Sequence, residues 1–420
     1  MSASIVARAL SRRTPFFYGW VVLFAVCCAG FARQGPAVAT LSIFVEPMTS
    51  EFGWSRTAIS GAVSLAGIMA AILSPMLGPM LDRHGARMML TLAILVTGLA
   101  VASLAFTTSL LYFYLAFCIA RTCFAGPFDL GIYGAVNNWF LRHRAMATAI
   151  SNVAMMTGLA CLPLVAQFSI DHAGWREAWL VVGATVLIVG LVPVWLLVAR
   201  RPEDLGLKID GGPGDVRPGG HGGSGGVRKE PAFTRAQALR TPTFWLLNLF
   251  TFLVYPIQAG ISLHQAPLLI ERGVDATTAA MVIAVFSVLS GASGLAFGVI
   301  VRRIGVRPSL LLSTWILIGA VFAMESLSNT TQAFMAAGLF GIAIGGMFTI
   351  LPVAWADYFG RESYGAIRGI ALSIQVIAQA SGPLISGVLR DVTGTYSLSL
   401  YVFAGFACLA FLAALFLRRP

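Results

Sequence analysis

Long apolar runs, separated by short polar segments, fill almost the whole chain. Each run has about 20 residues or more, which is long enough for a helix to cross a hydrocarbon core of about 30 Å. The pattern therefore predicts an all-α membrane protein with twelve membrane-spanning helices. Their approximate limits are residues 17–44, 55–81, 87–107, 109–138, 144–168, 176–199, 243–269, 277–301, 308–328, 331–356, 364–389 and 397–417.

The composition indicates that lipid is the solvent for most of the surface. Of the 420 residues, 58% are hydrophobic and only 11% are charged, and the mean hydropathy is +0.83. Globular domains carry about 25% charged residues, so a water-soluble globule of this composition could not hide its apolar surface. The six cysteines lie in apolar runs without a CxxC spacing, so we expect them to pack as small apolar side chains and predict no metal or cofactor.

The distribution of basic residues predicts the orientation in the membrane. The net charge is +11, and with a cytoplasmic N-terminus most of the 28 Lys and Arg residues lie on the cytoplasmic side. This asymmetry is the positive-inside rule, so the charge indicates topology and not a nucleic-acid partner. Both termini are expected in the cytoplasm. The basic residues on the opposite side are Arg56, Arg176, Arg272 and Arg390.

The chain divides into two similar halves. Residues 200–240 contain a glycine-rich stretch, so we expect a flexible cytoplasmic linker between a half at residues 1–199 and a half at residues 241–420. Several residues recur with the same identity 220 positions later, and this constant offset indicates a repeat of six helices. The matching residues of the first half are Gly78, Gly85, Arg87, Gly126, Asp171 and Gly174.

A charged motif lies between the second and third predicted helices. Residues 78–87 read Gly-Pro-Met-Leu-Asp-Arg-His-Gly-Ala-Arg. This segment resembles the loop between helices 2 and 3 of transporters of the major facilitator superfamily. The resemblance of the chain to that superfamily covers essentially its whole length. It implies two six-helix halves that rock around a central substrate site. It also implies a cytoplasmic gate formed by Gly78, Asp82, Arg83, Gly85 and Arg87.

The repeat of this motif differs at one charged position. Arg302 occupies the place in the second half that Asp82 occupies in the first. Asp82 can accept hydrogen bonds from a helix N-terminus or from an arginine at the cytoplasmic face. Arg302 needs an acidic partner, for which Asp357 and Glu362 are the candidates. We therefore expect an asymmetric gate.

The first 90 residues narrow the resemblance. Tyr18-Gly19-Trp20 begins the first helix and residues 44–56 end it, and together with residues 78–87 they resemble the monocarboxylate and oxalate/formate branch, including its bacterial members. This resemblance implies a small organic anion such as a carboxylate as substrate and a bacterial inner membrane as location. Those transporters carry an arginine in helix 8 that meets the substrate carboxylate, whereas residues 277–301 contain no charged residue.

Arg33 lies deep in the first predicted helix. It stands about 16 residues from the start of the helix, roughly 24 Å along its axis, which is too far for easy snorkelling to the cytoplasmic side. A charge at this depth is costly unless it faces a cavity or a partner, so Arg33 and the neighbouring Gln34 are candidates for contact with an anionic substrate. Structural pairing, or snorkelling to the outer surface, is the alternative. Gly35-Pro36 is expected to loosen the helix here.

Arg121 and Asp129 lie in the fourth predicted helix. Their spacing places them about 12 Å apart along a helix, too far for direct pairing but close enough to face one cavity. An arginine early in this helix resembles a superfamily motif that has been linked to coupling or to substrate charge. We therefore expect Arg121 and Asp129 to couple transport to protons. For Asp129, a structural salt bridge between helices is the alternative.

Polar side chains mark a substrate path in the second half. Tyr255 and Gln258 lie at helical spacing in the seventh predicted helix, and Gln375 and Gln379 lie on or near one face of the eleventh. Because these side chains recur on single faces of apolar helices, we expect them to line the substrate site.

The chain carries no recognisable catalytic motif. It has no Gly-Lys-Ser/Thr phosphate loop, no nucleophile elbow and no zinc-binding helix, so neither ATP hydrolysis nor another enzyme activity is expected. The sequence predicts a monomeric secondary transporter of a small organic anion, driven by protons or exchanging one anion for another. The alternatives are efflux of amphipathic compounds and a sensor that binds a solute without moving it.

Overall fold

The computed structural model describes residues 5–211 and 231–420, and its secondary structure is helical. The glycine-rich stretch of the predicted linker falls on residues 212–230, which lie outside the described residues. The α-helices are α1 (Ile5–Arg13), α2 (Gly19–Ala32), α3 (Val38–Phe52), α4 (Arg56–Ser103), α5 (Leu110–Ala125), α6 (Pro127–Trp139), α7 (Arg144–Ala173), α8 (Trp175–Val186), α9 (Val192–Leu197), α10 (Arg235–Leu239), α11 (Pro242–Glu271), α12 (Ala276–Ile304), α13 (Val306–Glu325), α14 (Thr330–Phe359), α15 (Tyr364–Thr393) and α16 (Ser397–Phe416). The short 3-10 and π segments are η1 (Leu104–Phe106), η2 (Leu187–Leu191), η3 (Pro202–Leu205) and η4 (Ile209–Gly211).

The helices account for the predicted membrane spans. Among the described residues, ten helices are long and apolar enough to cross a membrane. The longest, Ala58–Phe106, bends at Gly85, whose φ of 82° is not helical, so it contains the second and third predicted spans. The first predicted span is shared by α2 and α3. The predicted all-α membrane fold is therefore confirmed.

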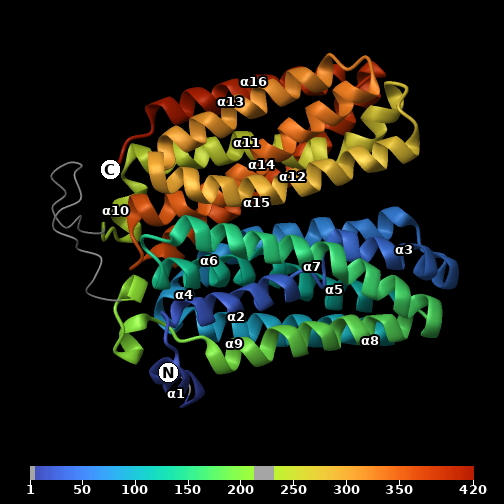
Figure 1. The fold of residues 1–420 in the computed structure, drawn as a ribbon. Coiled ribbons are helices and arrows are strands. Elements are labelled where there is room, and N and C mark those ends of the chain that lie inside the picture. The colour runs from blue at the N-terminus through green and yellow to red at the C-terminus, as the bar shows by residue number, and fades with distance from the viewer. Residues whose placement is uncertain (1–4, 212–230) are drawn as a thin grey trace. The chain divides into compact units, whose positions relative to one another are not determined.

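The helices form two compact units. The first contains Met1–Arg235 together with Trp355–Ile370, and the second contains Ala236–Ala354 together with Ala371–Pro420. Figure 1 shows α2 to α9 bundled in the first unit and α11 to α16 bundled in the second. The end of α14 and the start of α15 thus pack with the N-terminal helices, although both helices continue into the second unit.

The two halves of the chain repeat the same helix limits. α15 begins and ends 220 residues after α7, and α12 begins 220 residues after α4. Four of the matched glycines also share a backbone conformation. Gly85, Gly174, Gly305 and Gly394 have φ values of 82°, 99°, 87° and 78°, which residues with a side chain rarely adopt. The repeat seen in the sequence therefore reflects equivalent helix junctions.

Proline explains where the repeat is imperfect. Gly126 and Pro127 separate α5 from α6, because proline lacks an N–H group and disfavours a helical conformation of the residue before it. The equivalent helix α14 carries Met347 at this position and is continuous. The expected loosening at Gly35-Pro36 is confirmed, because the chain leaves the helical path between α2 and α3. Irregular backbone thus lies inside two predicted spans of the first half.

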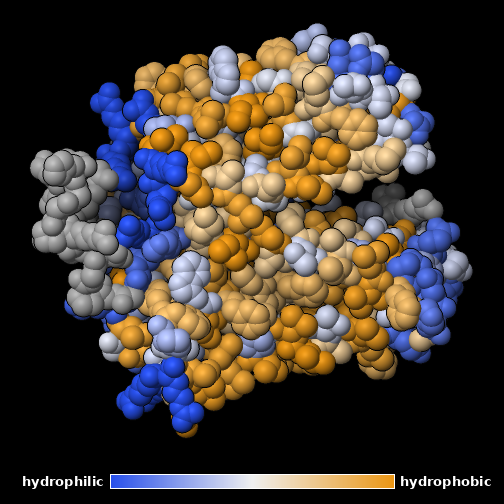
Figure 2. Space-filling view, viewed as in Figure 1, coloured by the Kyte–Doolittle hydropathy of each residue, from blue (hydrophilic) through white to orange (hydrophobic). Residues whose placement is uncertain are grey.

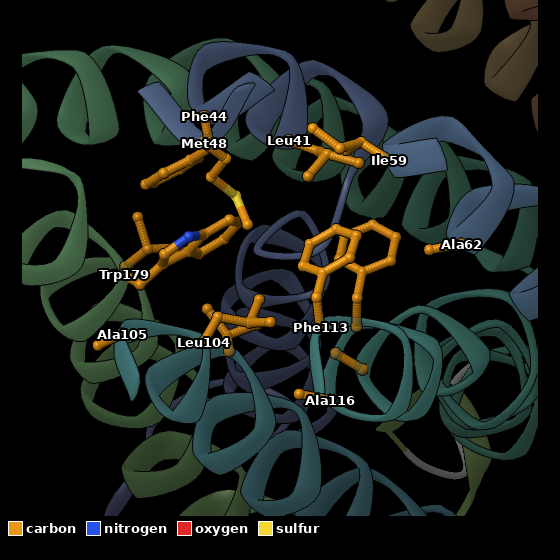
Figure 3. Close-up of a cluster of buried hydrophobic side chains, with 14 of the residues drawn as sticks. Leu41, Phe44, Met48, Ile59, Ala62, Leu104, Ala105, Phe113, Ala116 and Trp179 are labelled. Carbon is orange, nitrogen blue, oxygen red and sulfur yellow. The ribbon is translucent and has the colours of Figure 1, made fainter. Parts of the chain in front are cut away.

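An aromatic cluster forms part of the core of the first unit (Figure 3). Phe44 of α3 stacks on Trp179 of α8 with ring centroids 3.6 Å apart, and both side chains are fully buried. Phe113 and Phe117 stack within α5 at 5.5 Å. Because flat rings fill space densely and lose little rotamer freedom, this cluster fixes α3 against α8.

Apolar side chains also cover the outer flanks of the helices, and hydrophilic residues gather at the helix ends (Figure 2). Leu164 and Phe168 of α7 are more than half exposed, and so are Leu384 and Val388, which follow them by 220 residues in α15. Exposed apolar side chains at repeated positions of a long helix are typical of a lipid-facing surface.

Replacing Phe44 with alanine is expected to destabilise the purified protein in detergent by about 2–4 kcal/mol, because it leaves a cavity against Trp179. The measurement is the thermal transition of intrinsic fluorescence. Phe106→Ala is the matched control, since Phe106 is 67% exposed and loses few protein contacts on truncation. Equal shifts for the two variants would show that the Phe44 stack adds nothing to stability.

Candidate functional site

Asp129 is the centre of a buried ion cluster in the first unit. It lies in the first turn of α6, where the helix dipole favours a negative charge, and its side chain is 6% exposed. One carboxylate oxygen, Oδ1, lies 3.7 Å from Nη1 of Arg33, and the other, Oδ2, lies 3.2 Å from Nη2 of Arg368. Asp129 therefore bridges the end of α2 and the start of α15. Asp129 is thus ion-paired between helices, and its coupling role stays a prediction.

Arg33 stands at the break between α2 and α3. It follows the last residue of α2, so its position depends on the turn at Gly35-Pro36. Its Nη1 donates to Sδ of Met155 at 3.3 Å, and its guanidinium carbon lies 4.4 Å from the centroid of the Phe124 ring. Its Nε is buried without a hydrogen-bond partner. Arg33 is thus held within the helix bundle and does not extend to the outer surface.

Arg121 approaches the same aromatic ring. Its guanidinium carbon lies 3.9 Å from the centroid of Phe124, and its Nη1 donates to the backbone oxygen of Pro36 at 3.3 Å. Two arginines therefore lie against one phenyl ring. In the described part of the chain, the ion pairs of Asp129 are with Arg33 and Arg368, and not with Arg121.

Sequence reasoning missed Arg368. Its side chain is only 2% exposed, although it lies within the eleventh predicted span. A charge inside an apolar span was the available signal, the same one that indicated Arg33. The repeat gave no further hint, because Thr148 occupies the equivalent place in α7. The C-terminal half of the chain thus contributes an arginine, although residues 277–301 contain none.

A second ion pair in the first unit involves Asp357, a residue expected at the gate. Nη1 of Arg144, the first residue of α7, lies 2.7 Å from Oδ1 of Asp357 near the end of α14. Asp357 was one of the two acidic partners expected for Arg302. Arg144 is almost completely buried and also donates to the backbone oxygen of Asn137 at 3.3 Å. A partner for Arg302 stays a prediction.

Asp82 caps the N-terminus of α15. Its Oδ1 accepts a hydrogen bond from the N–H of Gly365 and its Oδ2 accepts one from the N–H of Ala366, each at 2.8 Å. The first N–H groups of a helix have no partner within the helix, so the carboxylate satisfies two of them and meets the positive end of the dipole. This is the contact with a helix N-terminus that the sequence predicts for Asp82, whose gating role stays a prediction.

Glycines let α4 and α15 approach backbone to backbone. A Cβ atom at Gly78 would lie 2.1 Å from the oxygen of Gly365, and one at Gly365 would lie 2.3 Å from the oxygen of Gly78. One turn further, a Cβ atom at Gly369 would lie 2.5 Å from the oxygen of Ser74. Small residues four positions apart on both helices are typical of close helix crossings in membranes. The crossing brings the N–H groups of α15 within reach of Asp82.

The chain after α9 covers the same end of the first unit. Nη2 of Arg200 donates to the backbone oxygen of Asp82 at 2.7 Å, and Glu203 pairs with Arg361 at 2.9 Å. Asp210 accepts hydrogen bonds from two N–H groups of the loop before α7, at 3.1 and 2.7 Å. We refer to the surface formed by residues 82–85, 139–144, 200–210 and 357–366 as the linker end.

The other predicted gate residues have different surroundings. A Cβ atom at Gly85 would lie 2.6 Å from the side chain of Arg200. The glycine therefore leaves room for Arg200, which follows α9, to pack against α4. Arg87 lies 4.8 Å from the ring centroid of Trp195 in α9, and Arg83 is exposed. Of the predicted set, Gly78 and Asp82 contact α15.

The structure brings together two of the four candidates in the second unit. Nε2 of Gln379 donates to Oε1 of Gln258 at 3.3 Å, which links α15 to α11. Tyr255 and Gln375 are buried within their helices. In the first unit, Gln34 is buried beside Arg33. The candidates of the second unit thus lie within α11 and α15, whereas Gln34 lies in the turn between α2 and α3.

A family model for the Major Facilitator Superfamily matches residues 22–269 and 259–420, which together cover almost the whole chain. The chain belongs to the major facilitator superfamily. This result confirms the resemblance carried by residues 78–87. It also confirms the expectation that the chain is not an enzyme, because the family consists of membrane transporters and proteins built like them.

Similar proteins within the superfamily include transporters and a sensor. Monocarboxylate transporter 11 of Mus musculus is 28% identical over 405 residues, which are 93% of this chain and 85% of that protein. The membrane sensor protein UhpC of Salmonella typhimurium is 29% identical over 361 residues, which are 81% of this chain and 78% of that protein. The solved structure of the proton:xylose symporter XylE has a TM-score of 0.76 at 14% identity and covers 96% of both chains. The chain therefore has the superfamily fold and resembles the monocarboxylate branch.

Replacing Gly78 with alanine is expected to push α4 away from the start of α15, because the new Cβ atom would overlap the backbone oxygen of Gly365. Loss of the hydrogen bonds to Asp82, about 1.5–3 kcal/mol, should speed amide hydrogen exchange in the first turn of α15 by about tenfold or more. Gly319→Ala is the matched control, since a Cβ atom there meets nothing within 4 Å. Unchanged exchange in Gly78→Ala would mean that the close crossing is not required.

Proposed function

We propose that the protein is a secondary transporter that moves a small organic anion, most simply a carboxylate, by alternating access. The observation that carries this proposal is a buried cluster in which Arg33 and Arg368 share the carboxylate of Asp129, while Arg121 lies against the same Phe124 ring as Arg33. A buried cation without a counter-ion is costly, and an anionic solute supplies the missing charge. The planar fork of arginine also matches the two oxygens of a carboxylate.

The comparisons support an anionic substrate. Monocarboxylate transporters of mouse, rat and zebrafish are similar to this chain over more than nine-tenths of its length. We assign substrate contact to Arg33 and Gln34 in the first unit. The further residues that we assign to the substrate path are Tyr255, Gln258, Gln375 and Gln379.

We place the protein in a bacterial inner membrane, as a monomer, with its linker end and both termini in the cytoplasm. The linker end carries Arg142, Arg200, Arg201 and Arg361, and basic residues favour the cytoplasmic side of a membrane. In this orientation the contact between Asp82 and the N-terminus of α15 belongs to the cytoplasmic gate. Alternating access then requires this contact to open once in each cycle.

We assign the coupling role to Asp129 together with Arg121. In proton symport, a proton on Asp129 weakens its ion pairs and frees donors of Arg33 and Arg368 for the anion. In anion exchange, the entering anion competes with Asp129 for the same donors without a proton. Both modes use one carboxylate that binds the arginines while the substrate is absent.

A solute sensor is the second candidate function, because the similarity to UhpC of Salmonella typhimurium is as high as that to the transporters. A sensor binds its solute without moving it across the membrane. Saturable binding to the purified protein without uptake into proteoliposomes would favour this candidate over transport.

Arg33→Ala is expected to lower kcat/KM for carboxylate uptake into proteoliposomes by at least about a hundredfold, because it removes a buried cation from the site. The variant should still fold, since Asp129 keeps its ion pair with Arg368. Arg303→Ala, at an exposed position near the end of α12, is the control and should transport normally. Unchanged saturable uptake by Arg33→Ala would refute the role of Arg33 in anion binding.

Asp129→Asn is expected to abolish accumulation of the anion under an imposed pH gradient, because asparagine cannot take up and release a proton. Exchange of external for internal labelled anion at equal pH should continue. Asp171→Asn, at an exposed position near the end of α7, controls for the loss of a carboxylate. Accumulation that survives in Asp129→Asn would exclude Asp129 as the proton-coupling residue.

A further inference from the structure

The ring of Phe124 lies against two arginines of the first unit. Its centroid is 3.9 Å from the guanidinium carbon of Arg121 and 4.4 Å from that of Arg33. The separation of the two guanidinium carbons cannot exceed the sum of these distances. Two like charges this close repel each other, and the repulsion is stronger where little water screens it. A stabilising contact is therefore needed to keep both groups in place while an anion is absent.

Phe124 lies where the two interrupted membrane spans of the first unit meet. It belongs to the last turn of α5, directly before the break at Gly126-Pro127. Arg121 stands three residues earlier on the same helix, so its side chain and the ring lie on one face. Arg33 comes from the other break, at the end of α2, where Arg121 also donates to the backbone oxygen of Pro36. The ring thus contacts one arginine from each of the two broken spans.

A ring face affects an arginine differently from a carboxylate. The negative face of an aromatic ring attracts a cation but supplies no oxygen acceptor. It therefore offsets part of the cost of burying Arg33 and Arg121 without competing with a solute carboxylate for their N–H groups. Asp129, in contrast, is an oxygen acceptor that pairs with Arg33. A leucine at position 124 could fill space, but it has no such face and would attract neither cation.

We infer that Phe124 is a positioning residue for anion binding, whose ring keeps Arg33 and Arg121 together so that both donate to a single carboxylate of the solute. This inference rests on the proposed function, since it concerns the same site. If the ring did not attract them, the two guanidinium groups would separate while the site is empty. Binding would then include the cost of bringing them together again, so the affinity for the anion would fall.

The test changes the electron density of the ring while its shape stays nearly constant. Phe124 is replaced in the whole chain by phenylalanines that carry one, two or three ring fluorines, because each fluorine weakens the attraction of the ring face for a cation. Proteoliposomes are assayed for saturable uptake of labelled lactate and labelled succinate. We expect KM for the transported anion to rise stepwise, to about tenfold with three fluorines, while kcat changes by about twofold or less. Thermal stabilisation of the detergent-solubilised protein by the same anion should decrease in the same order.

Ordinary variants separate the ring from its volume. Phe124→Tyr keeps an aromatic face and should keep KM within about threefold of the unchanged protein, whereas Phe124→Leu should raise KM about tenfold. Phe117→Leu is the matched control in the same helix, because Phe117 is fully buried and stacks on the ring of Phe113. It should lower the thermal transition but leave KM unchanged. Each variant is first shown to have a cooperative thermal transition.

The outcomes distinguish this inference from the function on which it rests. A KM that stays constant along the fluorine series, in a protein whose uptake depends on Arg33, would overturn the role of Phe124 and leave anion transport intact. A rise of KM in Phe124→Leu that the fluorinated rings do not reproduce would also overturn it, since it would show that only the bulk of the ring matters. Absence of saturable uptake and of stabilisation by both anions in the unchanged protein would overturn the inference together with the proposed function.

Discussion

The ion pairs of Asp129 with Arg33 and Arg368 join three places where helices begin or end. Two of these places exist because proline interrupts a membrane span, at Gly35-Pro36 and at Gly126-Pro127. Irregular backbone is tolerated at membrane depth only where protein or a polar cavity satisfies its exposed groups. The two helix breaks therefore supply polar backbone groups near the ion pairs. They also set the positions of Arg33 and Asp129 at helix ends.

Stability alone does not account for this cluster. Buried ion pairs are often no more stabilising than apolar side chains of similar size, because each charge must first lose its water. Elsewhere in the first unit, the stack of Phe44 on Trp179 shows how α3 and α8 are held by packing without any charge. The proposed anion binding gives a reason for two arginines to share one buried aspartate that the needs of folding do not give.

The sequence predicted the features that depend on local patterns. Hydropathy located the spans, the depth of Arg33 marked it as a buried cation, and the shared glycines marked the helix junctions of both halves. Arg368 was missed because its contact joins residues 239 positions apart, and one sequence does not show which distant helices meet. The pairing of Asp357 with Arg144 escaped prediction for the same reason. The spans, the buried charge and the helix junctions were predictable because they follow from local sequence. Which charged residues pair with each other was not predictable, because it depends on distant helices.

The first turn of α15 connects the two functional regions of the first unit. Gly365 and Ala366 donate their N–H groups to Asp82, and Arg368 pairs with Asp129 within the same helical turn. Because backbone hydrogen bonds make one turn rigid, this turn cannot withdraw from Asp82 without also moving Arg368. Under the proposed function, an anion that replaces Asp129 as the partner of Arg368 changes the free energy of the contact at Asp82. By linkage, opening that contact changes the affinity for the anion by the same factor, which is the coupling that alternating access requires.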